Sequence, residues 1–338
     1  MRLQNKQKAS SQDGAFFCAK IVKNTIKDTR EAPAAYHADS RRIERIVQMN
    51  NNWKSKKDLL PYSLLVGAAT TLFFRQLWRL TLSNYVVENP KIPEAFDGLR
   101  ILQLSDLHNN KLICHNGRLA TRIRALAPDI VVVTGDAVDS SWTNSDISVR
   151  LFREISDVCP IYYVPGNHEA RLQEKDILFR MFKQAGARLL FDRREYMEKG
   201  GEKLSISGVM DPHFDRIRKK GISSSMRMTL RLRRLPPVEP DCFNILLSHR
   251  SEHIAIYSEK GYDLIFAGHA HGGQWRLPAF GAVYSPNQGL FPEYTSGVHR
   301  MGSATMIVSR GLGNSAVPLR INNPFELVMV TLKRKKIR

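Results

Sequence analysis

Five short polar clusters, each directly after an apolar run, are the feature that most constrains the fold of this chain. The apolar runs are rich in Val, Ile and Leu and comprise Leu102–Leu104, Ile130–Val133, Ile161–Val164, Ile245–Leu247 and Leu264–Ala267. Short, continuous apolar runs are typical of strands that are buried on both faces. Helical patterns at 118–126, 148–158 and 176–186 alternate with these runs and indicate an α/β fold.

The polar clusters carry five of the ten histidines of the chain, together with Asp and Asn residues. They are Asp106-Leu-His108, Gly135-Asp136, Gly166-Asn167-His168-Glu169, Ser248-His249 and Gly268-His269-Ala270-His271-Gly272-Gly273. Because ligands of an open α/β sheet gather beyond the carboxyl ends of its strands, we expect the clusters to share one crevice. Mixed oxygen and imidazole donors favour Mn, Fe or Zn over Ca or Mg. The sequence therefore predicts a metal site.

The order of the clusters resembles that of the calcineurin-like metallophosphoesterase superfamily, over about residues 98–335. This resemblance implies an α/β fold with two packed sheets flanked by helices. It also implies two divalent metal ions and a metal-bridging hydroxide that attacks phosphorus. Further motifs resemble a bacterial membrane-tethered branch, some of whose members hydrolyse the pyrophosphate of nucleotide-activated lipids; these motifs are Gly268–Gln274, Leu277-Pro278, Ser309–Gly313 and Pro318–Arg320.

Seven residues match the metal ligands of this superfamily. Asp136 matches the carboxylate that bridges two ions about 3.5–4 Å apart, and we expect it to offer an oxygen to each. The remaining ligands of the first ion match Asp106, His108 and His271, and those of the second match Asn167, His249 and His269.

His168 matches a histidine that faces the phosphate, where it protonates the leaving oxygen or stabilises the charged transition state. We therefore predict His168 and Asp136 as the catalytic residues. For Glu169 two interpretations stand. It holds the imidazole of His168 in its working tautomer, or it is an acid favoured at a helix N-terminus. His213 lies in a loop predicted to rim the site.

Residues 59–82 are predicted to form a transmembrane or membrane-anchor helix. Leu59–Phe74 is uncharged and mostly apolar, but the span of about 20 residues that a bilayer requires is reached only by including Arg75 and Arg79. The alternative is an amphipathic helix that lies on the membrane or packs on the domain. Residues 1–58 are predicted to be a basic, poorly ordered tail, and residues 83–97 a linker to the domain at 98–335.

The side of the membrane follows from charge. Lys54, Lys56 and Lys57 precede the apolar segment directly, and fewer cations follow it. The positive-inside rule then leaves the N-terminus in the cytoplasm and places the catalytic domain outside, in a single-pass protein of the cell membrane.

A net charge of +19 favours anionic partners without choosing among them. The basic stretch Arg216–Arg234 is either a solvated surface helix or a lid that touches an anionic lipid or lipid-linked substrate. We predict a metal-dependent phosphoesterase acting on a membrane-associated phosphoester or pyrophosphate. One alternative is a nuclease or soluble nucleotide phosphodiesterase, although no nucleic-acid recognition module is visible. The other is a catalytically inactive binding scaffold, against which the intact ligand set argues.

Overall fold

The computed structural model describes Gly67 and residues 79–114, 117–140, 146–215, 221–278, 280–314 and 320–336. The chain divides into two compact units, Met1–Ala69 and Thr70–Arg338, and the fold below belongs to the second. The predicted tail at 1–58 and, apart from Gly67, the predicted anchor up to residue 78 lie outside the described residues. Within the described ranges, no helix is both long enough and apolar enough to cross a membrane.

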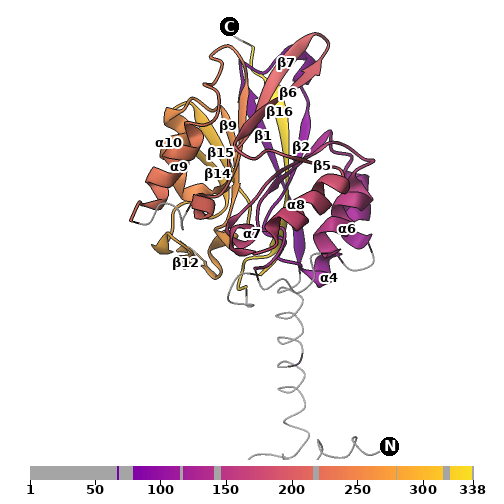
Figure 1. Ribbon diagram of the computed structural model, residues 1–338, viewed down its shortest axis with the longest axis vertical. Helices are drawn as coiled ribbons and strands as arrows, with labels where there is room; N and C mark the ends of the chain where they lie inside the picture. The colour runs from indigo at the N-terminus through magenta and orange to yellow at the C-terminus, as the bar shows by residue number, and fades with distance from the viewer. Residues whose placement is uncertain are drawn as a thin grey trace, which may run out of the picture. The chain divides into compact units, whose positions relative to one another are not determined.

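Two six-stranded sheets form the centre of the Thr70–Arg338 unit, counted over the described residues (Figure 1). The first sheet has the order β1 (Leu80–Asn89), β16 (Phe325–Arg334), β2 (Arg100–Leu104), β3 (Ile130–Thr134), β4 (Ile161–Val164), β5 (Ala187–Leu189). The second has the order β14 (Gly297–Met301), β15 (Ala304–Val308), β9 (Leu264–Gly268), β8 (Asn244–Arg250), β7 (Glu202–Gly208), β6 (Arg193–Lys199).

Helices cover the outer faces of both sheets. The first sheet packs against α5 (Arg118–Leu126), α6 (Asp146–Ile155) and α8 (Lys175–Gln184), and the second against α9 (Ser224–Leu232) and α10 (Ile254–Glu259). The predicted α/β sandwich of two sheets flanked by helices is confirmed. Shorter elements are α4 (Lys111–Cys114), α7 (Asn167–Arg171), the 3-10 helices η1 (Glu94–Phe96), η3 (Pro212–Asp215), η4 (Ser251–His253) and η5 (His271–Gly273), and the hairpin strands β10 (Arg276–Leu277), β11 (Gly281–Ala282), β12 (Tyr284–Ser285) and β13 (Gly289–Leu290).

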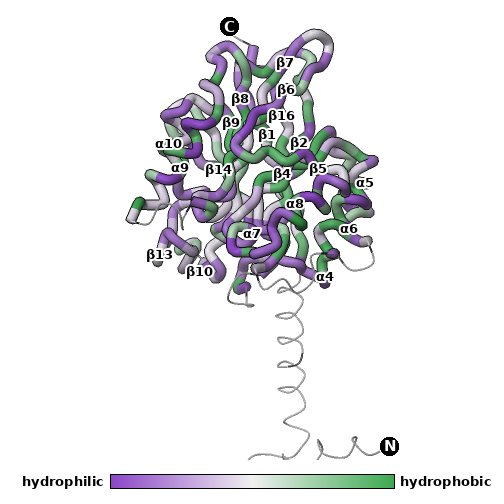
Figure 2. Tube along the Cα trace, viewed as in Figure 1, coloured by the Kyte–Doolittle hydropathy of each residue, from purple (hydrophilic) through white to green (hydrophobic). Residues whose placement is uncertain are grey.

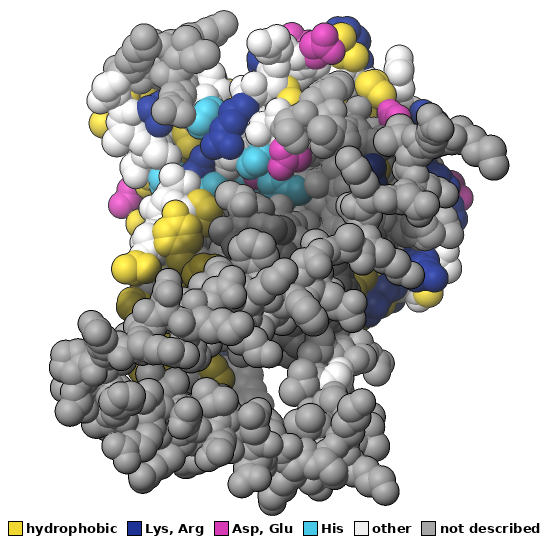
Figure 3. Space-filling model, turned by 90° about the horizontal axis from the view of Figure 1, so that it is seen from below, with side chains coloured by type: hydrophobic (Ala, Val, Ile, Leu, Met, Phe, Trp, Pro, Cys, Tyr) yellow, Lys and Arg dark blue, Asp and Glu magenta, His cyan; other side chains and the backbone are white. Residues whose placement is uncertain are grey.

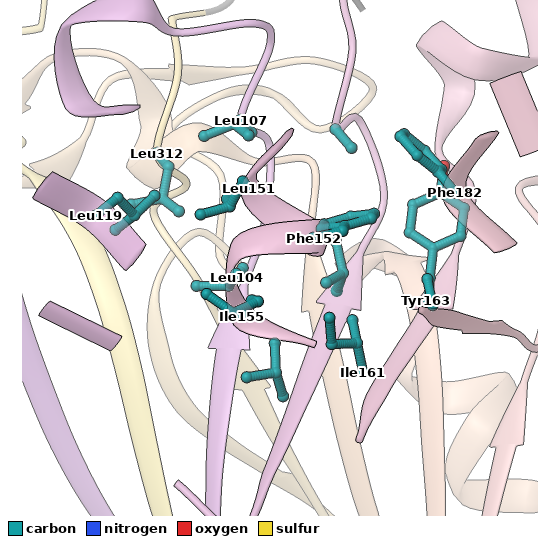
Figure 4. Packing of buried hydrophobic residues seen from close by; sticks show 14 of the residues in the cluster. Leu104, Leu107, Leu119, Leu151, Phe152, Ile155, Ile161, Tyr163, Phe182 and Leu312 are labelled. Carbon is teal, nitrogen blue, oxygen red and sulfur yellow. The ribbon is translucent and has the colours of Figure 1, made fainter. Parts of the chain in front are cut away.

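Strand β3 shows how an apolar run builds this sandwich. Ile130 and Val132 contribute to the core that contains residues of both sheets, whereas Val131 and Val133 pack with the helices of the first sheet. Alternate side chains of a strand point to opposite faces, so a strand between two layers must be apolar throughout. In Figure 2 the hydrophobic residues are concentrated along the central strands, and Figure 4 shows the helix-side packing around Phe152 of α6.

Strand β1 corrects the predicted boundary between anchor and linker. The sequence places Leu80–Leu82 in the anchor at 59–82 and assigns residues 83–97 to a linker. In the structure, Leu80–Asn89 is a strand that pairs in parallel with β16 along its whole length. Its burial is mixed, as expected for a strand at the edge of a sheet. Because its partner is the last strand of the chain, no local pattern reveals the pairing.

The carboxyl ends of strands from both sheets meet at one edge of the sandwich, which we call the metal edge. Nδ1 of His249, at the end of β8, lies 2.8 Å from the carbonyl oxygen of Thr134 at the end of β3. Between the sheets, Nε2 of Gln103 donates to the carbonyl oxygen of Ala267, 2.8 Å away. The crevice therefore lies between two sheets, whereas the sequence predicts it at the end of one open sheet.

Candidate metal centre

The seven side chains matched to metal ligands come together at the metal edge in two groups. In the first group, Nε2 of His271 lies 3.3 Å from Nε2 of His108 and 3.5 Å from Oδ1 of Asp106. All three side chains are buried and can offer ligand atoms to one ion.

The second group surrounds His249. Its Nε2 atom lies 3.1 Å from both Oδ1 of Asn167 and Nδ1 of His269. Oδ2 of Asp136 lies 3.2 Å from Nε2 of His249 and 3.7 Å from Nε2 of His108. This single oxygen therefore lies between the two groups.

The two oxygens of Asp136 have different roles. Oδ2 faces both groups, whereas Oδ1 accepts a hydrogen bond from the backbone N–H of His168 at 2.8 Å. Oδ2 thus lies between the two groups of candidate ligands, whereas Oδ1 fixes the first turn of α7.

The donor set fits divalent cations. Nε2 of His108 and Nε2 of His271 face each other, and a hydrogen bond between them would need one of the two to carry a proton. Nδ1 of His108 is buried and has no hydrogen-bond partner among the described residues. Converging imidazole nitrogens and carboxylate oxygens are the ligand atoms that divalent cations take in proteins.

The backbone is strained at five of the seven positions. Left-handed φ angles occur at Asp106 (50°), His108 (45°), Asp136 (50°), His269 (67°) and His271 (49°). Each such angle costs a non-glycine residue about 1–3 kcal/mol, and it persists only where the surroundings determine it. The loops therefore aim these side chains into the crevice at a cost in stability.

Two glycines let the loops close around the ligands. A Cβ atom on Gly166 would lie 2.2 Å from Oδ1 of Asp136, and one on Gly268 would lie 1.9 Å from Oγ of Ser105. Neither position tolerates a side chain without displacing a neighbouring loop. This close approach explains why glycine directly precedes Asn167 and His269.

Glu169 binds backbone and not the imidazole of His168. Its carboxylate accepts hydrogen bonds from the N–H groups of Asp136, Val138 and Gly166 at 3.0, 3.2 and 2.8 Å. The geometry favours the helix N-terminal interpretation over the tautomer-holding one. Burial, assisted by the charge of Asp136, raises the pKa of Glu169 to about 7. Glu169 ties the loop of Asp136 to the turn that carries Asn167.

His168 is oriented by a different group. Its Nδ1 atom accepts a hydrogen bond from the backbone N–H of Ser140 at 3.1 Å, so the proton of the neutral ring lies on Nε2. Oδ2 of Asp139 lies 3.7 Å from the same Nδ1 atom. His168 also lines the pocket described below. In the neutral ring, Nε2–H is therefore the group that can donate a hydrogen bond or a proton.

The charges of Asp136 and His249 are coupled. Burial acts to raise the pKa of Asp136, but the charge and hydrogen bond of His249 hold it well below its usual value. Burial acts to lower the pKa of His249, but Asp136 raises it to about 10. Without metal, His249 therefore keeps a proton at neutral pH, and an ion that binds its Nε2 atom must displace that proton.

Two buried arginines contact the histidines of the His269–His271 motif. An Nη1 atom of Arg250 lies 3.0 Å from Nε2 of His269, and an Nη2 atom of Arg320 lies 3.4 Å from Nδ1 of His271. Arg250 is itself held by Asp211, whose Oδ2 atom accepts from Nε at 2.5 Å. Each arginine donates to the ring nitrogen that does not face the ligand group. Sequence reasoning missed both roles, and its only local signal was the position of Arg250 directly after His249.

A pocket of about 610 Å³ opens beside the metal site. Its lining includes Asp136, Asn167, His168, His269 and His271, and, from other elements, Arg171, His213, Arg227 and Tyr284. His213 thus lies at the rim, as predicted. Figure 3 shows histidine and cationic side chains gathered on this face.

The arginines of the basic stretch Arg216–Arg234 differ in their surroundings. The structure describes this stretch from Gly221 onward. Arg231 is buried and forms ion pairs with Asp192 at 2.6 Å and Asp215 at 2.8 Å. Both sequence interpretations, a solvated helix and a lid, are therefore wrong for Arg231, because it packs α9 onto the domain. Arg227 lines the pocket, whereas Arg233 is exposed.

Fold and site together define a metallohydrolase. Residues 99–273 match the calcineurin-like phosphoesterase family, and the chain belongs to it. It is thus a hydrolase that acts on phosphoester bonds.

Its relatives extend over most of the domain. An uncharacterized metallophosphoesterase of Aquifex aeolicus is 29% identical over 81% of this chain and 98% of its own. The phosphodiesterase YaeI of Escherichia coli is 24% identical over 69% of this chain and 82% of its own. A "transmembrane protein with metallophosphoesterase domain" of Danio rerio is 24% identical over 72% of this chain and 55% of its own.

Proposed function

We propose that this protein hydrolyses a phosphodiester or pyrophosphate bond in a membrane-associated substrate, with two divalent ions at the metal edge. The observation that carries the proposal is the position of Oδ2 of Asp136 between two groups of buried ligands. The first ion is assigned to Asp106, His108, Asp136 and His271, and the second to Asp136, Asn167, His249 and His269.

The bound ions supply Lewis-acid activation of the phosphoryl group and of the attacking water. The chain supplies position and a proton. The N–H of His168 donates to the carboxylate of Asp136, and the backbone N–H of Asp136 donates to Glu169, so these contacts orient the carboxylate. His168, with its proton on Nε2, donates that proton to the leaving oxygen. Asn167 contributes a carbonyl without charge, which keeps the second ion electrophilic.

Two arginines support a substrate that carries a second anionic group. Arg171 of α7 and Arg227 of α9 line the pocket together with the ligands. Within the described residues neither has a carboxylate partner. Nη1 of Arg227 donates to the carbonyl oxygen of Ile222, and its Nε atom is buried without a hydrogen-bond partner. Guanidinium groups whose charge no carboxylate neutralises match a second phosphate, as in a pyrophosphate.

The membrane part of the proposal comes from the sequence. Leu59–Phe74 is uncharged and mostly apolar, and the Danio rerio relative is named a transmembrane protein. Because Leu80 begins a strand, an anchor must end before it, at Arg79 or earlier. The positive-inside rule places the catalytic domain outside the cytoplasm.

The test uses the full chain loaded with Mn²⁺ and bis(p-nitrophenyl) phosphate as a diester probe. Asp136→Asn should abolish hydrolysis and weaken binding of both ions, whereas His168→Asn should keep the ions and slow turnover by about 10²–10⁴-fold. Equal metal loss in both variants would make His168 a ligand. A wild-type chain that binds two ions and hydrolyses nothing would be a scaffold. Preferential cleavage of DNA over the probe would favour the nuclease alternative.

A further inference from the structure

Exposed apolar side chains are concentrated in one short segment. Among the described residues, six of the eleven large hydrophobic residues with exposed side chains lie between 275 and 291. They are Trp275 (37% exposed), Leu277 (48%), Phe280 (76%), Tyr284 (46%), Leu290 (70%) and Phe291 (66%), and we call them the apolar rim. Contiguous exposed apolar surface is rare on soluble domains and marks contact with a partner or a membrane.

The apolar rim belongs to the mouth of the pocket. It is carried by the hairpins β10–β11 and β12–β13, which follow the ligand His271 in the chain. Tyr284 and its neighbours Pro286 and Asn287 line the pocket, and Nδ2 of Asn287 lies 2.6 Å from Nε2 of His269. Figure 3 shows hydrophobic side chains beside the histidines on the same face. A surface that contacts the rim therefore also faces the pocket.

The preceding chain enters the domain at the same edge. Leu80 pairs with Phe325 at the start of β16, and β16 runs antiparallel to β2, with Val328 opposite Gln103. The start of β1 is thus at the end of the sheet where β2 leads into Asp106. Only residues 75–79 separate Leu80 from the apolar run Leu59–Phe74, and five residues reach at most about 18 Å. The chain that precedes β1 therefore joins the described domain at the metal edge.

We propose that the apolar rim docks on the surface of a phospholipid bilayer, so that the pocket takes phosphate groups of lipids directly from the headgroup layer. Trp and Tyr prefer this interfacial layer, and Phe and Leu enter the acyl boundary beneath it. Arg171 and Arg227 then face anionic headgroups at the pocket. The assignment of a lipid substrate rests on the proposed function, whereas the docking itself does not.

Docking is measured without any activity. The full chain with Trp53, Trp78 and Trp142 replaced by Phe keeps Trp275 as its single tryptophan. In phosphatidylcholine–phosphatidylglycerol vesicles with brominated acyl chains, its emission should shift to the blue and be quenched at least twofold. As a control, a variant with Trp275→Phe and Tyr196→Trp places the probe on β6, where quenching should be absent. If the emission of Trp275 is not quenched in vesicle-bound protein, the proposal is overturned. The same outcome is expected if residues before 79 cover the rim, and it overturns the proposal equally.

A second comparison identifies the residues that dock. Phe280→Ser with Phe291→Ser should abolish the quenching of Trp275, whereas Val86→Ser with Ile177→Ser should leave it unchanged. Val86 and Ile177 are also exposed but lie outside the rim, on β1 and α8. Equal loss in both double variants overturns the assignment, because it would mean that the rim has no special role.

The substrate class has its own readout. Phosphatidylglycerol vesicles should inhibit hydrolysis of bis(p-nitrophenyl) phosphate about tenfold more strongly, per exposed phosphodiester, than soluble glycerophosphoglycerol. The Phe280→Ser and Phe291→Ser variant should lose this difference and keep its activity on the probe. Equal inhibition by both forms in the wild type overturns a headgroup substrate. A wild-type chain without probe hydrolysis contradicts the proposed function instead, and leaves the quenching result standing.

Discussion

Arg250 is the residue whose contacts most directly link the fold to the candidate metal site. Its guanidinium group donates toward Nε2 of His269 and is held by Asp211, all within the buried interior. Because Nε2 accepts this hydrogen bond and a second one from Nδ2 of Asn287, a neutral His269 carries its proton on Nδ1. An ion that binds Nδ1 must therefore displace that proton. Burial acts against the charge of Arg250, but Asp211 compensates, so arginine and carboxylate form one unit behind the histidine.

Arg250→Met should destabilise the chain by about 3–5 kcal/mol, because Asp211 is left buried and unpaired. The double variant Arg250→Met with Asp211→Asn removes that charge and is the matched control. Its unfolding free energy, measured by denaturant titration, should recover. Equal destabilisation of both variants would show that the loss does not come from the unpaired charge of Asp211.

Arg227 and Arg233 offer a matched pair on one helix. Arg227 lines the pocket and Arg233, the C-cap residue of α9, is exposed. Arg227→Gln should raise the inhibition constant of pyrophosphate by about 10-fold or more, since a charged hydrogen bond contributes about 1.5–3 kcal/mol. Inhibition by orthophosphate, which the ions alone can bind, should change less than twofold. Arg233→Gln should alter neither constant, and an equal effect of both variants would point to long-range charge.

The seven candidate ligands were predictable because metal chemistry restricts both residue type and place. Asp, His and Asn each follow a buried strand closely, and that pattern is readable from sequence alone. The positioning arginines were not, because no spacing defines them: Arg320 contacts a histidine that lies 49 residues earlier. The role of Glu169 depended on backbone N–H directions, which residue identity does not encode.

Strand β1 is an element beside the metal edge that sequence reasoning missed. Leu80 and Leu82 pack against the helix-side core of the first sheet, and Oγ1 of Thr81 donates to the carbonyl oxygen of Phe325 at 3.0 Å. At the next residue of β16, the N–H of Glu326 donates to the carbonyl oxygen of Gly311, which lies beside Asp106. β1 thus supports β16 next to the metal site. Strands such as β3 were predictable because both faces are apolar, whereas an edge strand carries a weaker pattern.

Truncation tests this role. A chain that begins at Arg79 should keep the melting temperature and probe hydrolysis of the domain, because β1 stays complete. Removing residues 1–82 should lower both, since Leu80–Leu82 and the Thr81 hydrogen bond are lost. Removing residues 1–89 should yield aggregating protein, as β16 becomes an unprotected edge. If all three chains melt alike, β1 does not support the sheet. Thermal unfolding and light scattering give the readouts.

At the scale of the whole molecule, the metal edge joins the two sheets through ligands that come from both. β2, β3 and α7 belong to the first half, and β8 and the His269–His271 motif to the second. Without ions, the junction combines five left-handed backbone angles with converging lone pairs. Bound ions would replace that local instability with bonds that span both sheets. Metal binding and the stability of the sandwich are therefore linked.

Removal of the ions should consequently lower the melting temperature of the full domain, and not only its activity. At a free ion concentration of 100 times Kd, each ion stabilises by about 2.7 kcal/mol. Two ions then shift the melting temperature by on the order of 10 °C for a domain of this size. Calorimetry with and without EDTA, with metal content measured in parallel, gives the shift. Asp136→Asn should show a much smaller shift, because it lacks the shared oxygen. An equal melting temperature after complete removal of both ions would mean that the two sheets hold this edge together unaided.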